Sequence, residues 1–157
     1  MKLLPTGSQT VGPFFSIGMS ELCQKPPAEG SIPAGALTIF GKLLDGDKKP
    51  IPDALFEFWS GAEFVRVATN ENGSFCAVLK KPADHRHFNV LIFMRGLLRP
   101  VLTRVYFVKA DALNGDDTLE QVPEERRQTL FASSDNGTQF SWDIHMQGEN
   151  ETVFFDF

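Results

Sequence analysis

Short apolar runs separated by Asp-Gly and Asn-Gly pairs dominate the chain from residue 37 onward. These pairs stand at 45–46, 72–73 and 136–137. Both residue types of such a pair tolerate positive φ, so the pairs predict tight turns between strands. The chain is therefore expected to be all-β. The expected strands are Leu37–Leu44, Ala54–Trp59, Phe64–Thr69, Phe75–Leu79, Phe88–Met94, Gln128–Ser133 and Gln139–Met146.

Two of these runs show the alternation of a half-buried strand. In the last run, Phe140, Trp142, Ile144 and Met146 share one face, opposite polar neighbours. In the run 88–94, the even-numbered residues form a wholly apolar face. The other face is a mixture that does not resemble plain solvent-facing surface, and it carries His87, Asn89, Leu91, Phe93 and Arg95.

Residues 1–36 are rich in Pro, Gly and Ser and show neither strand nor helix periodicity. We therefore predict an extended N-terminal arm over residues 1–36 and a single antiparallel β-sandwich domain over residues 37–157. One short helix is expected in 123–130, where Pro123 precedes two acidic residues. The charge run 124–127 is typical of a solvated face. The apolar C-terminus, with Val153, Phe154, Phe155 and Phe157, predicts a surface covered by a partner.

The net charge and the cysteines limit which partners the chain can bind and in which cellular compartment it is expected. The chain has 15 Lys+Arg against 20 Asp+Glu, a formal net charge of −5, which argues against nucleic acid or an anionic membrane as partner. Cys23 and Cys76 lie far apart without a CxxC motif, as expected of reduced thiols. The N-terminus lacks the apolar region of a signal peptide, so we expect a cytoplasmic protein.

Candidate chemistry is sparse. His85 and His87 form a His-x-His pair whose imidazoles would share one strand face, which is a start for a metal site. Further ligands are needed, and the third histidine, His145, is distant in sequence. A polar strand start is the alternative interpretation. Arg95 ends an apolar run before Gly96, and Arg104 lies within a strand, where an arginine usually pairs with a carboxylate.

Several segments together resemble the intradiol ring-cleaving dioxygenase family. The segments Ser8–Phe15, His87–Gly96 and Thr103–Phe107 resemble its N-terminal signature and its core strands. Arg126–Leu130 and the ending Gln147–Phe157 resemble the α subunits of the family members that cleave protocatechuate. The resemblance implies a β-sandwich in an α/β heteromer. That enzyme opens protocatechuate with O2 and ferric iron to give 3-carboxy-cis,cis-muconate.

The family binds its iron through two Tyr and two His on a catalytic β subunit, and this chain departs from that pattern. Its first histidine position corresponds to His87 and its second to Asn89, while His85 lies outside the register. The chain has 15 Phe but one Tyr, Tyr106, and neither Phe nor Asn supplies an anionic oxygen to Fe3+. The stretch between Trp59 and His87 is also expected to be shortened.

The resemblance therefore implies a non-catalytic α subunit, inactive alone, whose Fe3+ is bound by the β subunit. By position, the substrate-binding residues would be Thr10, Gly12, Pro13 and Arg95, and this chain would hold no metal. Two alternatives stay open. One is a stand-alone metal-binding β-sandwich enzyme that uses His85 and His87. The other is a non-enzymatic binding module, which the excess of phenylalanine would also suit.

Overall fold

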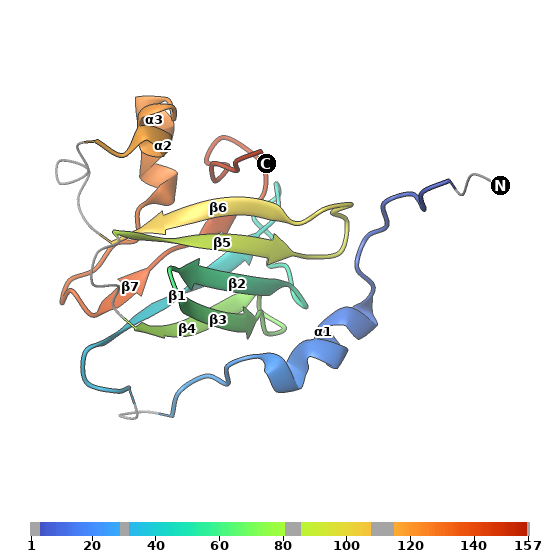
Figure 1. Cartoon of the computed structure of the whole chain (residues 1–157), viewed down its shortest axis with the longest axis horizontal. Helices are drawn as coiled ribbons and strands as arrows, with labels where there is room; N and C mark the ends of the chain where they lie inside the picture. The colour runs from blue at the N-terminus through green and yellow to red at the C-terminus, as the bar shows by residue number, and fades with distance from the viewer. Residues whose placement is uncertain (1–3, 29–31, 81–85, 108–114, 157) are drawn as a thin grey trace.

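The fold is built from two β-sheets packed face to face. The computed structural model describes residues 4–28, 32–80, 86–107 and 115–156 (Figure 1). In the first sheet, β1 (Ala36–Leu44) lies between β4 (Ser74–Lys80) and β7 (Gln139–Ser141), and the short β8 (Ile144–His145) also pairs with β1. The second sheet has the order β3 (Glu63–Ala68), β2 (Leu55–Ser60), β5 (His87–Phe93), β6 (Val101–Tyr106).

One continuous core fills the space between the sheets. β4 and β5 bury every second residue. β1 and β5, which lie inside their sheets, contribute side chains with no exposed surface, such as Ile39 and Val90. Phe56 of the second sheet meets Phe75 of the first with ring centroids 4.6 Å apart. The predicted β-sandwich is confirmed, and the alternation in the sequence follows from burial of one face of each strand.

Two of the expected strands, both in the C-terminal part of the chain, differ in the structure. Gln128–Ser133 is not a strand, because Gln128–Leu130 continues the helix α3 (Glu124–Arg127) as a 3-10 turn and buries Leu130. The run 139–146 is interrupted at Trp142 and Asp143, and both of its pieces pair with β1 in parallel. The first sheet is therefore mixed, whereas every pairing in the second sheet is antiparallel.

Two helices were not expected from the sequence. The helix α1 (Pro13–Met19) lies in the segment that we expected to be extended, and Pro13 stands at its first position, where a missing N–H costs no hydrogen bond. The helix α2 (Asp117–Glu120) is capped by Asp116, whose side chain accepts hydrogen bonds from the backbone N–H groups of Thr118 and Leu119. In the described residues, no helix is long and apolar enough to span a membrane.

The predicted turn at Asn72-Gly73 is present, but it joins strands of different sheets. Gly73 has φ +67°, in the left-handed region that favours glycine. Because β3 and β4 belong to opposite sheets, this turn passes from one layer to the other. The arm bridges the two edge strands that this turn connects, β3 and β4. The backbone N–H of Gln24 donates to Arg66 of β3, and its side-chain amide bonds both backbone groups of Val78 of β4.

The C-terminal segment packs on its own chain but stays half-buried, so its cover by a partner remains a prediction. Phe154 packs against the main core, while Val153 and Phe155 contact a second apolar cluster around Tyr106 and Leu130. The backbone N–H of Phe155 donates to Leu102 of β6 at 2.8 Å. Phe157 lies outside the described residues.

The charge run 124–127 also differs from expectation. Its two glutamates are exposed, but both arginines are half-buried. Arg126 donates to the backbone carbonyl of Glu151, and Arg127 donates to that of Val122. The two arginines therefore hold α3 against neighbouring backbone, so the run is solvated only on its acidic half.

Gly41 is the point where β1 meets the break between β7 and β8. A Cβ atom on Gly41 would overlap the backbone carbonyl of Trp142, and backbone cannot move aside as the end of a flexible side chain can. We expect Gly41→Ala to lower the free energy of unfolding by about 2 kcal/mol or more in urea denaturation. Gly18→Ala is the matched control, because nothing lies within 4 Å of that position. Equal stability of the two variants would contradict this account.

Candidate functional site

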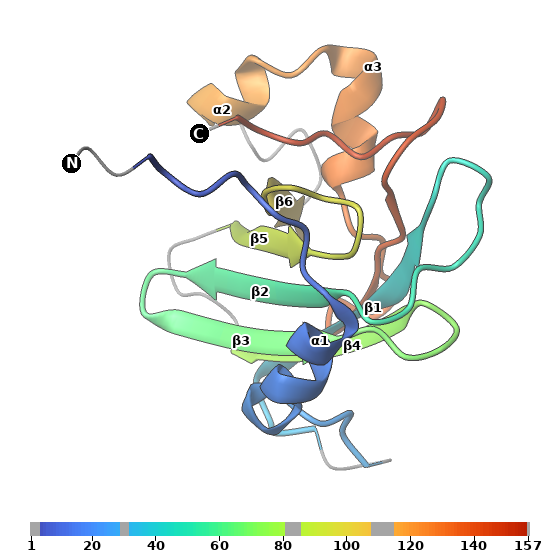
Figure 2. The ribbon, with the colours of Figure 1, turned by 90° about the vertical axis from the view of Figure 1, so that its right-hand side faces the viewer.

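The arm is fixed on the turn that follows β5. The backbone N–H of Gly96 donates to Oγ1 of Thr10 at 2.8 Å, and the rings of Phe15 and Phe93 lie 5.7 Å apart. Gly96 has φ +95°, a conformation that L residues rarely adopt. Figure 2 shows the arm running past the ends of β2 and β5 before it reaches α1. The arm and the turn therefore form one surface.

The four residues that the resemblance marks as substrate-binding all belong to this arm-and-turn surface. Gly12 is the N-cap of α1 and Pro13 its first residue. Arg95 lies in the turn, where its Nη2 is 3.6 Å from Oδ2 of Asp53. All four residues are exposed in this chain. The structure thus brings Thr10 and Arg95 to one place, although they are far apart in sequence.

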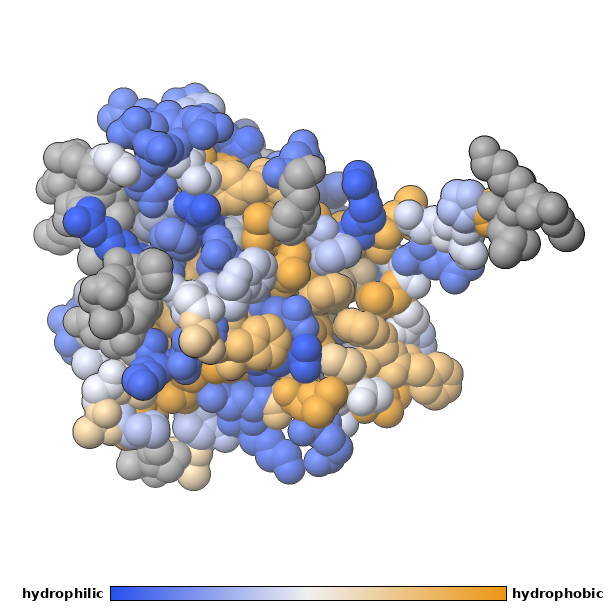
Figure 3. Space-filling view, viewed as in Figure 1, coloured by the Kyte–Doolittle hydropathy of each residue, from blue (hydrophilic) through white to orange (hydrophobic). Residues whose placement is uncertain are grey.

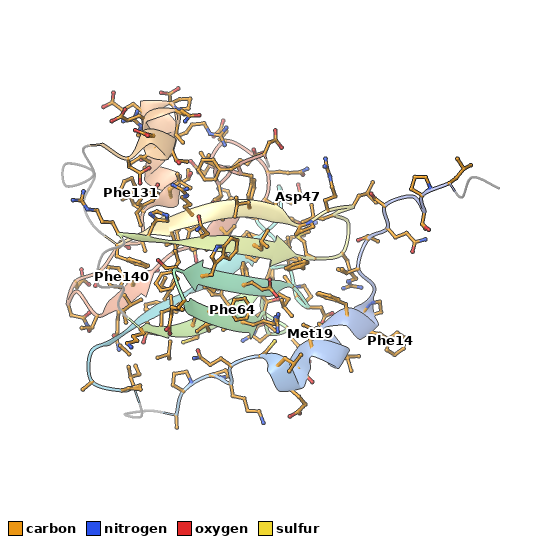
Figure 4. The ribbon with its side chains drawn as sticks, in the orientation of Figure 1. Phe14, Met19, Asp47, Phe64, Phe131 and Phe140 are labelled. Atoms are coloured by element: carbon orange, nitrogen blue, oxygen red, sulfur yellow. The ribbon has the colours of Figure 1, made fainter. Side chains whose placement is uncertain are left out.

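The hollow between the arm and the turn is small. A hollow of about 50 Å³ lies between arm and turn, too small for an aromatic acid. Around it the arm exposes large apolar side chains, among them Phe14 and Ile17. Figure 3 shows orange, hydrophobic surface in the region of α1. Phe14 points away from the sheets (Figure 4). A larger hollow of about 730 Å³ borders the same turn and is lined by Leu98, Arg99, Pro100, Val101, Phe154, Phe155 and Asp156.

His87 and Asn89 lie at the other end of β5. β5 begins at His87 and ends at Phe93, so Arg95 falls beyond its last residue. An extended strand rises about 3.3 Å per residue, so the six steps from His87 to Phe93 alone separate the two ends of β5 by roughly 20 Å. The residues of the mixed face are all half-buried from His87 to Phe93, as expected of a face that is not plain surface. Arg95, however, does not share a site with His87.

A network of charged and polar side chains surrounds His87 and Asn89, the two positions that the resemblance assigns to iron ligands. Arg104 of β6 lies at its centre. Its Nε donates to Oδ1 of Asn89 at 3.1 Å, and its Nη1 is 3.6 Å from Oδ1 of Asp116. The hydroxyl of Tyr106 donates to Oδ2 of Asp116 at 3.1 Å. Nδ1 of His87 lies 4.0 Å from that same oxygen. The expected carboxylate partner of Arg104 is therefore Asp116.

The environment shifts two pKa values in this network. Burial raises the pKa of Tyr106, and the opposing hydrogen bond from Arg104 does not cancel that effect. Burial alone would also raise the pKa of Asp116. Hydrogen bonds from the Leu119 N–H and from Tyr106, together with the nearby Arg104 and His87, outweigh it and lower the pKa of this carboxyl. Asp116 is thus held as a carboxylate.

These residues do not fit a ferric ion. The guanidinium of Arg104 bonds Asn89 and faces Asp116, so the oxygens that a cation would need already serve a fixed positive charge. Tyr106 is fully buried and its raised pKa disfavours the phenolate that binds Fe3+. No group of three or more metal-binding side chains occurs in the described part of the chain. His85 lies outside the described residues.

Reasoning from the sequence missed two acidic residues of these surfaces. Asp116 carried a readable signal, because an aspartate followed by Asp-Thr-Leu-Glu is typical of a helix N-terminus. Asp53 carried none, since its pairing with Arg95 depends on segments that are distant in sequence. The sequence did indicate that Arg104 needs a partner, because an arginine within a strand usually pairs with a carboxylate.

Known proteins share both the fold and the sequence. The structure resembles 3-chlorocatechol 1,2-dioxygenase from Rhodococcus opacus 1CP, with 16% identity over 92% of this chain and 69% of that chain and a TM-score of 0.56. It also resembles an intradiol ring-cleavage dioxygenase from Tetranychus urticae, with 12% identity over 78% and 87% and a TM-score of 0.50. The fold is that of the intradiol dioxygenases.

In sequence, the chain is 32% identical to a protocatechuate 3,4-dioxygenase alpha chain from Burkholderia cepacia, over 98% of each chain. It is 29% identical to an alpha chain of the same name from Pseudomonas putida, over 100% and 99%. No family model matches. The chain belongs to the family of protocatechuate 3,4-dioxygenase alpha chains, which are enzyme subunits.

The alignment with the Burkholderia chain runs over 197 positions against the 157 residues here, so that relative carries segments that this chain lacks. The chain is shorter than this relative, as expected for an α subunit that has lost part of its length. That the loss lies between Trp59 and His87 stays a prediction.

The network around Asp116 predicts a pH-dependent contribution to stability. Because the pKa of Asp116 is lower in the folded chain than its ordinary value, the folded state gains stability above the ordinary pKa. That gain is lost as the pH falls from about 5 toward the lowered pKa. We expect Asp116→Asn, which keeps a good capping side chain, to cost about 1–2 kcal/mol at pH 7 and less at pH 3.

Urea denaturation of both proteins at the two pH values measures this effect. Asp117→Asn is the matched control, since Asp117 begins the same helix but lies outside the network. The account of the network fails if Asp116→Asn costs as much at pH 3 as at pH 7, or if the control shows the same loss.

Proposed function

We propose that this chain is the non-catalytic α subunit of a protocatechuate 3,4-dioxygenase and completes the substrate pocket of an iron-bearing β subunit. One observation carries the proposal. The positions that correspond to iron ligands, His87 and Asn89, belong to a network organised by Arg104, whereas the arm and Arg95 assemble at the opposite end of β5. In this proposal the chain no longer has an iron site at His87 and Asn89, but it keeps the substrate-binding elements at the arm and Arg95.

The arm-and-turn surface supports a shared pocket. Thr10, Gly12, Pro13 and Arg95 are exposed together, and the hollow beside them is too small to hold a substrate alone. The exposed Phe14 and Ile17 provide an apolar face for the β subunit to cover. A Cβ atom on Gly12 would meet nothing within 4 Å, so a ligand can approach the backbone there.

In the assembled enzyme, the Fe3+ of the β subunit supplies the chemistry that opens protocatechuate with O2 to 3-carboxy-cis,cis-muconate. This chain binds and orients the substrate. Protocatechuate carries a carboxylate, and the guanidinium of Arg95 is a suitable counter-ion at a partly dry pocket wall. The hydroxyl of Thr10 holds the turn that presents Arg95, through the N–H of Gly96. The free thiols of Cys23 and Cys76 support a cytoplasmic location.

Two other functions are less well supported. A stand-alone metalloenzyme would use His87, but Nδ1 of His87 lies 4.0 Å from Asp116 and the Arg104 cation shares that carboxylate. A binding module without an enzymatic partner would suit the exposed phenylalanines. It would not account for the similarity to dioxygenase alpha chains over the whole length.

The purified full-length chain should bind no stoichiometric iron and have no ring-cleaving activity, because its one tyrosine and the pair His87 and Asn89 cannot supply the four family ligands. Iron analysis and the visible absorption of tyrosinate-bound Fe3+ test this. Co-expression with the β subunit should yield a coloured, active complex. A red-brown chain with one iron per molecule would overturn the proposal.

Arg95→Met in the complex should lower kcat/KM for protocatechuate by roughly tenfold to a hundredfold, since a charged hydrogen bond is worth about 1.5–3 kcal/mol. The loss should be smaller for catechol, which lacks the carboxylate, and the iron content should not change. Lys42→Met, which removes an exposed cation from β1 of the other sheet, is the control. Equal losses on both substrates, together with a weaker complex on gel filtration, would make Arg95 an interface brace instead.

A further inference from the structure

The carboxylate of Asp53 faces Arg95 just beyond the end of the β2–β5 ladder. Leu55 of β2 pairs with Phe93 of β5. The ladder ends at this pair, and the backbone of each strand continues for two residues, to Asp53 in a bend and to Arg95 in a turn. Their side chains are about half exposed, with Nη2 and Oδ2 3.6 Å apart. The adjacent ends of two paired strands therefore bring these side chains together.

Asp53 also has an unusual backbone. Its φ is +59°, in the left-handed region that L residues other than Asn and Asp rarely enter. Aspartates in turns commonly use the carboxylate to hold nearby backbone, as Asp45 does by accepting from the N–H groups of Asp47 and Lys49. Within the described residues, the carboxylate of Asp53 instead has Arg95 as its partner. Turn formation therefore does not explain the side chain.

We propose that Asp53 is a positioning residue that orients the guanidinium of Arg95 toward the shared pocket; this inference rests on the proposed function. A guanidinium has five N–H donors in a planar fork. Asp53 occupies one edge and leaves donors on the others for the carboxylate of the substrate. The bond from Gly96 to Thr10 fixes the turn from the arm side, so Arg95 is held from two directions.

The test uses the complex with the β subunit. Asp53→Asn removes the charge and keeps both the shape and a residue type that tolerates this φ. We expect it to raise KM for protocatechuate about two- to fivefold, the range of an exposed ion pair, with kcat changed much less. KM for catechol should change by less than that range. Asp53→Gly, which also suits the backbone, should behave in the same way, and this would exclude backbone strain as the cause.

Asp47→Asn is the matched control, because it removes the same charge from the exposed pair of Asp47 and Lys49 (Asp47 is labelled in Figure 4). It should leave both KM values as they are in the unmodified complex. In the Arg95→Met background, Asp53→Asn should add no further loss. A second readout does not depend on activity. In NMR relaxation of the free full-length chain, the Nε–Hε group of Arg95 should become more mobile in Asp53→Asn.

The outcomes separate this inference from the proposed function. If Arg95→Met shows no loss specific to the carboxylated substrate, the proposed role of Arg95 fails. If that loss is present but Asp53→Asn leaves KM for protocatechuate unchanged, or lowers it, Asp53 does not position Arg95 and only the present inference fails. Equal rises in KM on both substrates would make Asp53 a purely structural residue of the turn and would also overturn it.

Discussion

β1 hydrogen-bonds to neighbours on both of its edges, and the rest of the structure depends on that double pairing. β4 lies along one edge, and β7 and β8 lie along the other. The close approach of Trp142 to Gly41 lets the C-terminal part of the chain reach β1 twice. Because β8 is followed by the segment that pairs with Leu102 of β6, this approach also sets where the C-terminus crosses the second sheet. A side chain at position 41 would disturb both layers.

The network around Arg104 shows how a cluster of half-buried polar side chains is satisfied in this fold. Residues on the outer face of β5 and β6 still point to one place, and their polar groups need partners when half-buried. A guanidinium supplies donors to Asn89 and a charge to Asp116, so the cluster is satisfied without an ion. Truncating one member would leave another half-buried group unpaired, which is why the cluster persists as a unit. Because Asp116 interacts with this cluster as a carboxylate, the stabilisation that it provides weakens when Asp116 is protonated.

The sequence predicted β1 to β5 and the short helix α3 well, and it predicted α1, α2 and the strands after residue 128 poorly, for physical reasons. β4 and β5 are buried on one face, so their side chains alternate, and the pattern alone places them within one or two residues. The helices α1 and α2 are too short to show a periodicity that could be detected. α2 is stabilised by the Asp116 cap, whereas α1 has no side-chain cap and begins at Pro13. The break at Trp142 follows from contact with Gly41, a tertiary constraint that is absent from local sequence.

The network at one end of β5 was partly predictable from the sequence, whereas the arm-and-turn surface at its other end was not. The pairing of Arg104 with a carboxylate follows from a general rule about charges within strands, so the need for a partner was visible although the partner was not. The meeting of Thr10 with the turn at Gly96 follows from no local rule, and the resemblance alone pointed to it. A strand that is rigid along its length keeps its two ends apart. A chain can therefore fill the ligand positions at one end with an ion pair and leave the binding surface at the other end unchanged. The separation of His87 from Arg95 along β5 therefore lets the two ends of the strand differ independently, which is what the proposed role of this chain requires.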